Sequence, residues 1–202
     1  MLFLSFLRLL KNIILRRREY LPSFKKRFAS FGEGSVIHYP SLITEHENIS
    51  IGKNTTILAN SRIQIYNALT GREAKIAIGS NCYFGFHLTI LAGGSINIGD
   101  DVLIASNVLI TSENHGMNPE SKIPYMNQPL ECKDVSIGEG SWIGEKVSVM
   151  PGVNIGKKCV IGTNAVVTKS IPDYSMALGI PARVIKKWNF EKHEWEKVLI
   201  LS

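Results

Sequence analysis

The segment LITSENHGMNP places one histidine, His115, among polar and turn-forming residues. A histidine side chain has an unperturbed pKa near neutral pH, so it can accept a proton and return it during one reaction. Glu113 and Asn114 precede His115 and are candidates for orienting the imidazole or for contacting a substrate. In a strand, successive side chains point to opposite faces, so the side chains of Glu113 and Asn114 cannot both face His115. Acid–base catalysis is therefore the chemistry that this segment predicts.

The sequence predicts neither a covalent nucleophile nor a metal site. It has no GxSxG motif, and Cys132 has no histidine close to it in the sequence. The three cysteines lack zinc-ligand spacing and are too few for a disulfide framework, which favours a reducing compartment. We expect no metal ion in this protein.

The formal charge of +6 is unevenly distributed over the 202 residues. Residues 1–30 contain eight of the 23 basic residues and one of the 17 acidic residues, which leaves 15 basic and 16 acidic residues elsewhere. A nucleic-acid groove needs basic residues along the folded surface. We therefore expect no nucleic-acid partner.

Residues 1–30 are expected to form a basic, amphipathic helical segment. Apolar residues from Phe3 to Ile14 fall on one side of a helix, and Arg8 and Lys11 fall on the other. These charges come too early for a transmembrane span, and no small-residue cleavage site follows. Two interpretations remain open: the helix packs on the domain or a sister subunit, or residues 1–18 contact an anionic membrane surface. We expect a cytoplasmic protein, located at the inner face of the membrane in the second case.

From residue 137 the chain divides into six-residue units: IGEGSW, IGEKVS, VMPGVN, IGKKCV, IGTNAV and VTKSIP. The first position is aliphatic in all six units, and the second is glycine in four of them. The pattern also begins at Ile51, Ile78 and Ile98, and the slips of register between these blocks indicate short insertions or turns. A period of six matches neither the 3.6-residue helix nor the two-residue strand.

A six-residue period fits short strands that are joined by tight turns into a coil. The first and fifth positions would face inward, and glycine and asparagine would supply the turn conformations. Stacked coils satisfy one another's backbone hydrogen bonds at a strand spacing of about 4.8 Å. Cys82 and Cys159 occupy fifth positions, so we expect them to be inert interior residues.

This repeat resembles the hexapeptide-repeat family over about residues 35–187. The resemblance implies an all-β fold, a left-handed parallel β-helix with three units per triangular coil, and a homotrimer with active sites between subunits. The expected organisation is an N-terminal helical segment at 1–30, a β-helix domain at 31–187 with an extended loop at 112–135, and a C-terminal cap at 188–202.

Residues 78–187 also resemble the sugar O-acetyltransferases, including galactoside and maltose acetyltransferases and the enzymes that modify capsule and O-antigen polysaccharides. The resemblance lies in FGFHLTI, INIGDDVLIASNVLITSENHG, VSIGEGSWIGEKVSVMPGVNIG, VIGTNAVVTKSIP and GIPARVIKKW. It implies that acetyl-CoA is the co-substrate and that His115 is the general base. His115 would take the proton of an acceptor hydroxyl, which attacks the thioester carbonyl directly.

The resemblance also implies which residues bind acetyl-CoA. Trp142 would contact the pantetheine arm or the acyl pocket. The other expected contacts lie in GTNAVVTKSIP and GIPARVIKK, and they are Thr163, Thr168 and Lys169 for the pantetheine and its phosphates, and Arg183 and Lys186 for the nucleotide phosphates. The family commonly has arginine where Lys186 stands.

The expected acceptor site departs from that of the galactoside enzymes. Gly85 replaces an asparagine that helps those enzymes to hold the acceptor near the base, and His87 replaces a second asparagine. With Glu113 and Asn114, these residues form the predicted substrate-binding set. Because the set differs, we expect a sugar of a surface polysaccharide, or of its precursor, rather than galactoside or maltose.

The sequence leaves three alternative functions to consider. An amino sugar or an antibiotic as acceptor would keep the same chemistry. A metal-dependent hydratase on the same solenoid would need three converging histidines, whereas only His87 and His115 lie near the relevant coils. A non-catalytic scaffold would not need the combined histidine, tryptophan, TK and PAR motifs.

Overall fold

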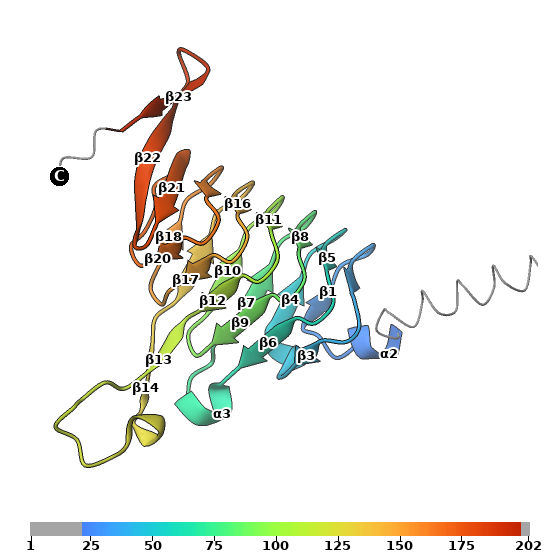
Figure 1. Cartoon of the computed structure of the whole chain (residues 1–202). Helices are drawn as coiled ribbons and strands as arrows, with labels where there is room; N and C mark the ends of the chain where they lie inside the picture. The colour runs from blue at the N-terminus through green and yellow to red at the C-terminus, as the bar shows by residue number, and fades with distance from the viewer. Residues whose placement is uncertain (1–21, 199–202) are drawn as a thin grey trace, which may run out of the picture.

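The computed structural model describes residues 22–198, which form a three-sided solenoid of short parallel strands (Figure 1). Six successive coils each contribute one strand to each of three sheets, called here sheets 1, 2 and 3 in the order in which the chain visits them. Each strand forms hydrogen bonds with the equivalent strands of the preceding and following coils. This arrangement confirms the predicted coil of stacked strands.

The strands of each sheet follow one another at intervals of about one coil. Sheet 1 contains β1 (Ser30–Phe31), β4 (Ile49–Ile51), β7 (Ile76–Ile78), β10 (Ile96–Ile98), β15 (Val135–Ile137) and β18 (Asn154–Ile155). Sheet 2 begins with β2 (Val36–Ile37), β5 (Thr56–Ile57), β8 (Tyr83–Phe84), β11 (Leu103–Ile104), β16 (Trp142–Ile143) and β19 (Val160–Ile161). Sheet 3 contains β3 (Leu42–Ile43), β6 (Arg62–Ile65), β9 (Thr89–Ala92), β12 (Leu109–Thr111), β17 (Ser148–Val149) and β20 (Val166–Val167).

Four short elements interrupt the coils. They are α2 (Pro22–Lys25), the 3-10 turns η1 (His46–Asn48) and η2 (Tyr125–Asn127), and α3 (Asn67–Thr70). The antiparallel strands β13 (Glu113–His115) and β14 (Leu130–Cys132) form a separate two-stranded hairpin. Residues 1–21 lie outside the described residues, and so does the predicted helix at their positions.

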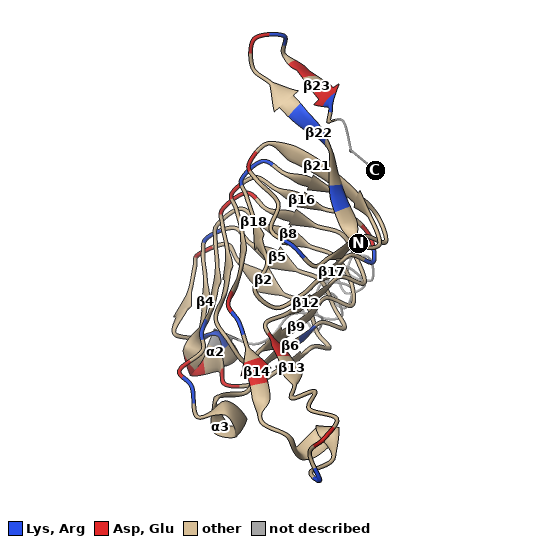
Figure 2. Ribbon diagram, turned by 90° about the vertical axis from the view of Figure 1, so that its left-hand side faces the viewer, with Lys and Arg blue, Asp and Glu red and all other residues tan. Residues whose placement is uncertain are grey.

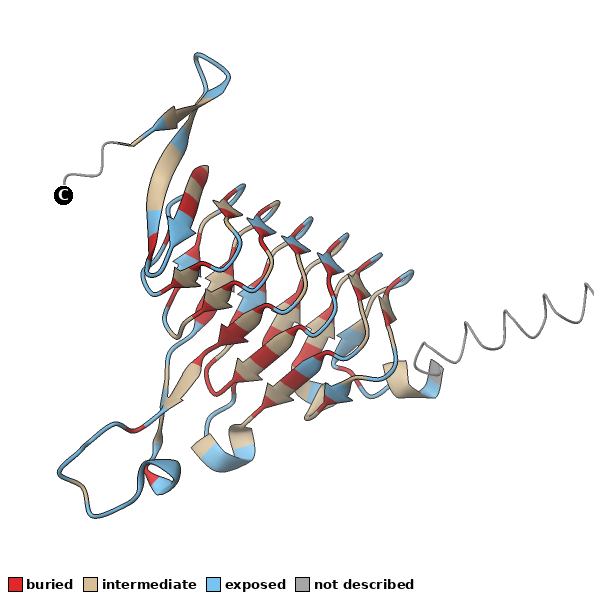
Figure 3. Ribbon diagram, in the orientation of Figure 1, coloured by how far each residue is buried: buried red, intermediate tan, exposed pale blue. Residues whose placement is uncertain are grey.

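The six-residue repeat in the sequence coincides with the positions that are buried in the core. The first and fifth positions of the units from residue 137 are all buried, whatever their residue type. They comprise Ile137, Ser141, Ile143, Val147, Val149, Val153, Ile155, Cys159, Ile161, Ala165, Val167 and Ile171. Figure 3 shows the resulting alternation of buried and exposed positions along every coil.

Turns between the sheets require backbone conformations with positive φ. Asn107 and Asn164 adopt φ values of 61° and 61° between sheets 2 and 3, and His87 has a φ of 58° at the equivalent turn of its own coil. Asparagine enters this left-handed region more readily than most residues. His87 therefore occupies a turn position, with an exposed side chain.

Gly85 is buried and lies where two coils approach closely. A Cβ atom at this position would lie 2.6 Å from the backbone nitrogen of Ser106 in the next coil. The missing side chain therefore has a packing role, in addition to its predicted effect on acceptor binding.

The C-terminal segment, in which a cap was predicted at 188–202, extends sheet 2. After β20, the chain adds β21 (Ser175–Gly179), β22 (Ala182–Asn189) and β23 (Glu194–Lys197) to the end of sheet 2, the last two as an antiparallel hairpin. Ala182 is buried and Val184 packs against the core, but Trp188 and Trp195 contact each other outside the core cluster. The β22–β23 hairpin thus projects beyond the last coil (Figure 1).

Cys82 and Cys159 lie inside the solenoid with 2% and 1% of their surfaces exposed. Burial raises the pKa of both thiols, so the reactive thiolate form is disfavoured. The prediction of inert interior cysteines agrees with this placement.

In residues 22–198, no helix has the length and apolar character needed to cross a membrane.

Candidate active site

His115 lies at the end of β13, on the hairpin that leaves the solenoid after β12 and returns to it at β15. Glu113 pairs with Cys132 and His115 pairs with Leu130 across the two strands. The predicted loop at 112–135 is therefore an ordered ribbon at its root, with the turn of η2 beyond it. Pairing to β14 holds His115 away from the coils.

Short-range polar contacts fix the point at which the hairpin leaves the solenoid. The Ser112 hydroxyl donates to the Gly94 carbonyl at 2.7 Å and accepts from the Gly94 N–H at 3.1 Å. The Thr111 hydroxyl donates to the Glu113 carbonyl at 3.0 Å. Ser112 and Thr111 are buried, so these bonds replace the water that their polar groups lose.

Gln128 holds the outer part of the hairpin together. Its side-chain amide nitrogen donates to the carbonyls of Asn118 and Ile123, both at 3.0 Å, and its amide oxygen accepts from the Asn118 N–H at 3.0 Å. The side chain is 7% exposed. Because few side chains of this segment are packed, these hydrogen bonds are the main contacts that stabilise its conformation.

A groove of about 470 Å³ lies between the hairpin and α3, and His115 is part of its wall. Glu113 lines the same groove because it lies two residues from His115 on one strand, whereas Asn114 does not line it. The complete lining comprises Tyr66, Leu69, Glu113, His115, Met126, Asn127, Gln128, Pro129 and Leu130. A base, a neighbouring carboxylate and an apolar wall suit a sugar ring with one reacting hydroxyl.

Tyr66 and Leu69 belong to the segment around α3, which the sequence analysis did not assign to the site. The only signal for it was the slip in the six-residue register before Ile78. The Tyr66 hydroxyl lies 3.3 Å from the Arg62 guanidinium, and Leu69 is 76% exposed at the groove. These residues give the groove a second wall that is contributed by an earlier coil.

Cys132 lies beside Glu113 but is a poor nucleophile. Burial raises the pKa of its thiol, and this effect outweighs the nearby Arg72 charge, which lowers it. The raised pKa disfavours the thiolate, which is the nucleophilic form of cysteine. In residues 22–198, no group of three or more His, Cys, Asp or Glu side chains is placed to share a metal ion.

Trp142 lies on the outer face of sheet 2, not in the groove. Its register partners are Leu103 on one side and Val160 on the other, and Leu103 pairs in turn with Tyr83. Tyr83, Leu103 and Trp142 are 46%, 42% and 51% exposed. Three large apolar side chains thus form an exposed stripe that a ligand or a second protein surface can cover.

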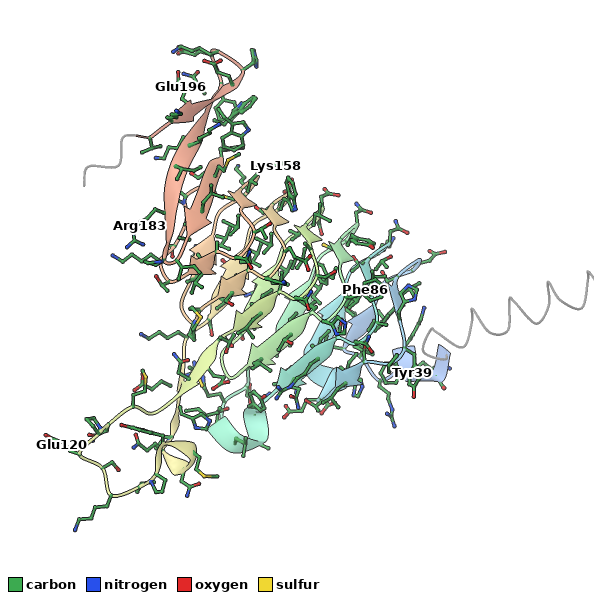
Figure 4. The ribbon with its side chains drawn as sticks, in the orientation of Figure 1. Tyr39, Phe86, Glu120, Lys158, Arg183 and Glu196 are labelled. Atoms are coloured by element: carbon green, nitrogen blue, oxygen red, sulfur yellow. The ribbon has the colours of Figure 1, made fainter. Side chains whose placement is uncertain are left out.

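The other predicted acetyl-CoA contacts are distributed over different parts of the molecule. Thr163 is exposed in the turn between sheets 2 and 3, whereas Thr168 and Lys169 are exposed in the turn that follows sheet 3. Arg183 lies near the start of β22, where its side chain points outward (Figure 4). One protomer therefore does not bring all of them to His115.

Gly85 and His87 also lie outside the groove of the same protomer, at the turn between β8 and β9. Of the predicted acceptor residues, only Glu113 lines the groove with His115.

Comparisons with known proteins agree with this geometry. The family model described as "Bacterial transferase hexapeptide (six repeats)" matches residues 134–169, and the model described as "Hexapeptide repeat of succinyl-transferase" matches residues 75–112. The chain is 35% identical over 199 residues to the putative lipopolysaccharide biosynthesis O-acetyl transferase WbbJ of Escherichia coli (strain K12), covering 96% of this chain and 93% of that protein. It is 40% identical over 162 residues to the galactoside O-acetyltransferase of the same strain, covering 79% and 77%.

Two solved structures illustrate the likeness in three dimensions. A galactoside acetyltransferase in complex with coenzyme A superposes with a TM-score of 0.60 at 29% identity, covering 94% of this chain and 86% of that one. AntD, an N-acyltransferase from Bacillus cereus in complex with dTDP and 3-hydroxybutyryl-CoA, superposes with a TM-score of 0.73 at 22% identity, covering 87% and 92%, which establishes the fold alone. These matches confirm the left-handed β-helix.

Gly93→Ala should displace the hairpin that carries His115. A Cβ atom at Gly93 would lie 2.7 Å from both the Cys132 sulfur and the Glu113 Cβ. We expect turnover to fall at least about 10-fold, because a 1 Å misplacement of a catalytic group can cost more than that. Hydrogen exchange should show faster exchange in β13 and β14 with unchanged exchange in β16 and β19. Unchanged turnover and exchange would contradict the proposed seating of the hairpin.

Proposed function

Because the chain belongs to the hexapeptide-repeat O-acetyltransferase family, we propose that it acetylates a hydroxyl of a surface-polysaccharide sugar or of its lipid-linked precursor. The chain is an acetyl-CoA-dependent acetyltransferase, and acetyl-CoA is its co-substrate. The proposal concerns the acceptor, the residues that act on it, the assembly of the protein and its place in the cell.

His115 acts as the general base in this proposal. Its imidazole removes the proton of the acceptor hydroxyl, and the hydroxyl oxygen forms a bond to the thioester carbonyl carbon. The carbon–sulfur bond then breaks, and the imidazolium returns the proton to the departing thiolate. The reaction needs neither a covalent enzyme intermediate nor a further reactant. Glu113, on the same face of β13, is placed to orient the imidazole or to bind the acceptor.

The observation that carries the proposal is the groove that holds His115 and Glu113 beside an apolar wall. The preference for a polysaccharide acceptor is supported by similarity to WbbJ over nearly the whole of both chains. It is also supported by Gly85 and His87, which replace the two asparagines of the galactoside enzymes.

The site is proposed to be shared between copies in a homotrimer. His115 leaves the solenoid at the end of sheet 3, whereas Trp142 and its apolar stripe lie on sheet 2. Because these are different sides of a triangular solenoid, a neighbouring copy is needed to place one beside the other. The exposed stripe of Tyr83, Leu103 and Trp142 suits such a contact.

Residues 1–18 are proposed to hold the protein at the inner face of the cytoplasmic membrane. The support comes from the sequence, in which an apolar stripe is followed by Arg16, Arg17 and Arg18. Anionic lipid attracts such residues with about 1 kcal/mol each. A position at the membrane would bring the groove close to a lipid-linked acceptor.

His115→Ala should lower the rate of acetyl transfer by about 10²–10⁴-fold, the usual contribution of a general base. The measurement is release of free CoA thiol from acetyl-CoA, over a panel of acceptors that includes surface-polysaccharide fragments. CoA affinity should be unchanged, and His38→Ala, at a histidine outside the groove, should keep full activity. Equal activity of His115→Ala and wild type would contradict the assigned base. A wild-type protein that neither binds CoA nor releases thiol would contradict the proposed function.

The full chain should sediment with vesicles that contain anionic lipid and not with vesicles of neutral lipid. Added salt should weaken binding, because the attraction is electrostatic. Replacing Arg16, Arg17 and Arg18 with glutamine should reduce binding, whereas the same change at Lys157 and Lys158, at the far end of the solenoid, should not. If the variant without the three arginines bound anionic vesicles as well as the variant without the two lysines, the membrane proposal would be contradicted.

A further inference from the structure

Sheet 3 carries a single charge, on the strand that leads to the groove. Its six strands lie within the described residues and contain one charged residue, Arg62 of β6. Arg62 is exposed, and Figure 2 shows the strands of sheet 3 otherwise in tan, with acidic residues in red on β13 and β14. Among residues 22–198 the one ion pair joins Lys192 and Glu196, so no described acid pairs with Arg62. Arg62 is therefore a cation that an anion from outside the chain can reach.

Two neighbouring side chains hold the Arg62 guanidinium in one orientation. Its Nε donates to the Gln64 amide oxygen, and its Nη2 donates to the Tyr66 hydroxyl at 3.3 Å. The Tyr66 hydroxyl donates in turn to the same Gln64 oxygen at 3.5 Å. The edge formed by both Nη groups has no other partner among the described residues. Such an edge can bind a carboxylate through two parallel hydrogen bonds.

Tyr66 connects this guanidinium to the groove of the candidate active site. The Tyr66 side chain lines the groove, and its hydroxyl is the group that contacts Arg62. Strand β9 separates β6 from β12, which leads into the hairpin that carries Glu113. Two strand spacings, about 10 Å, thus separate the Tyr66 wall from the Glu113 wall. Arg62 therefore lies on the side of the groove that is away from the Glu113 carboxylate.

We propose that the acceptor is an acidic sugar whose carboxylate binds Arg62, with Tyr66 as the residue that positions the guanidinium. An exposed ion pair contributes little to binding unless its geometry is fixed and bidentate, and Gln64 and Tyr66 supply that geometry.

The charges of the groove also orient such an acceptor. Glu113 repels a second anion, so the carboxylate of the sugar is favoured at the Arg62 end and the reacting hydroxyl at the His115 end. The inference rests on the proposed function of the chain as a sugar acetyltransferase. It adds Arg62 and Tyr66 to the residues that recognise the acceptor.

The test is acetyl transfer by the full-length protein to the methyl glycosides of glucuronic and galacturonic acid and to their uronamides, in which a neutral amide replaces the carboxylate. The wild-type kcat/KM for the preferred acid should exceed that for its amide about 10-fold, the usual effect of a hydrogen bond to a charged group. Arg62→Gln should remove this preference by raising KM for the acid. Its kcat should stay unchanged, because the contact is present in both the ground state and the transition state.

Three further variants separate recognition from a structural effect. Arg27→Gln, the same change at the exposed arginine that follows α2, should keep the preference for the acid. Tyr66→Phe keeps the ring and removes the hydroxyl, so it should weaken the preference a few-fold and leave use of the amide unchanged. Arg62→Lys keeps the charge without the planar fork and should restore only part of the preference. Circular dichroism and the melting temperature establish that each variant is folded.

Several outcomes would overturn the inference. Equal use of acid and amide by the wild-type protein would reject an acidic acceptor, and so would acetylation of other sugars but of neither probe; acetyl transfer would still stand. If Arg62→Gln lost activity on UDP-glucose, a neutral sugar on a diphosphate, but kept it on the uronic acid, Arg62 would be a phosphate contact instead. If the wild-type protein released no thiol with any acceptor, the proposed function would be rejected together with the inference.

Discussion

The stacking of one coil on the next is the constraint on which the rest of the structure depends. Each strand takes its hydrogen bonds from the coils on either side, as when the Trp142 N–H donates to the Cys159 carbonyl at 2.8 Å. A strand that slipped by one residue would turn its aliphatic side chains outward. Every coil must therefore keep its register, and outward-facing residues of successive coils are aligned in columns. Segments that leave the coil do so at the turns, where an insertion does not break this pairing.

Both parts of the site follow from that constraint. The column on sheet 2 aligns Tyr83, Leu103 and Trp142 because their strands are paired in register. The hairpin that carries His115 leaves at the turn after sheet 3, and buried Thr111 and Ser112 hold its base. In the proposed site, the solenoid provides a straight surface for a long co-substrate, and the β13–β14 hairpin provides the acid–base group. Burial raises the pKa of the Cys82, Cys132 and Cys159 thiols, and their disfavoured thiolate forms support the proposal that the His115 imidazole is the reactive group.

The repeat was predictable from sequence because, in the units from residue 137, two of six positions face the interior and hold only small or aliphatic residues. For the same reason, the break in the repeat around His115 predicts a functional segment from the sequence alone. Alternation along a strand predicted that Glu113 and Asn114 could not both face the base, and only Glu113 lines the groove. Contacts between segments distant in sequence were not predictable. The wall contributed by Tyr66 and the antiparallel end of sheet 2 both depend on such contacts.

The central claim is that acetyl transfer occurs at a site to which one copy contributes His115 and another contributes Trp142. The most direct measurement is the activity of mixed oligomers, in which His115→Ala and Trp142→Ala chains carry different affinity tags, are co-expressed and are isolated through both tags. Each variant alone should be nearly inactive. The mixed oligomers should regain part of the wild-type activity, because some of their sites combine an intact histidine with an intact tryptophan. Mixed oligomers as inactive as the separate variants would contradict the shared site.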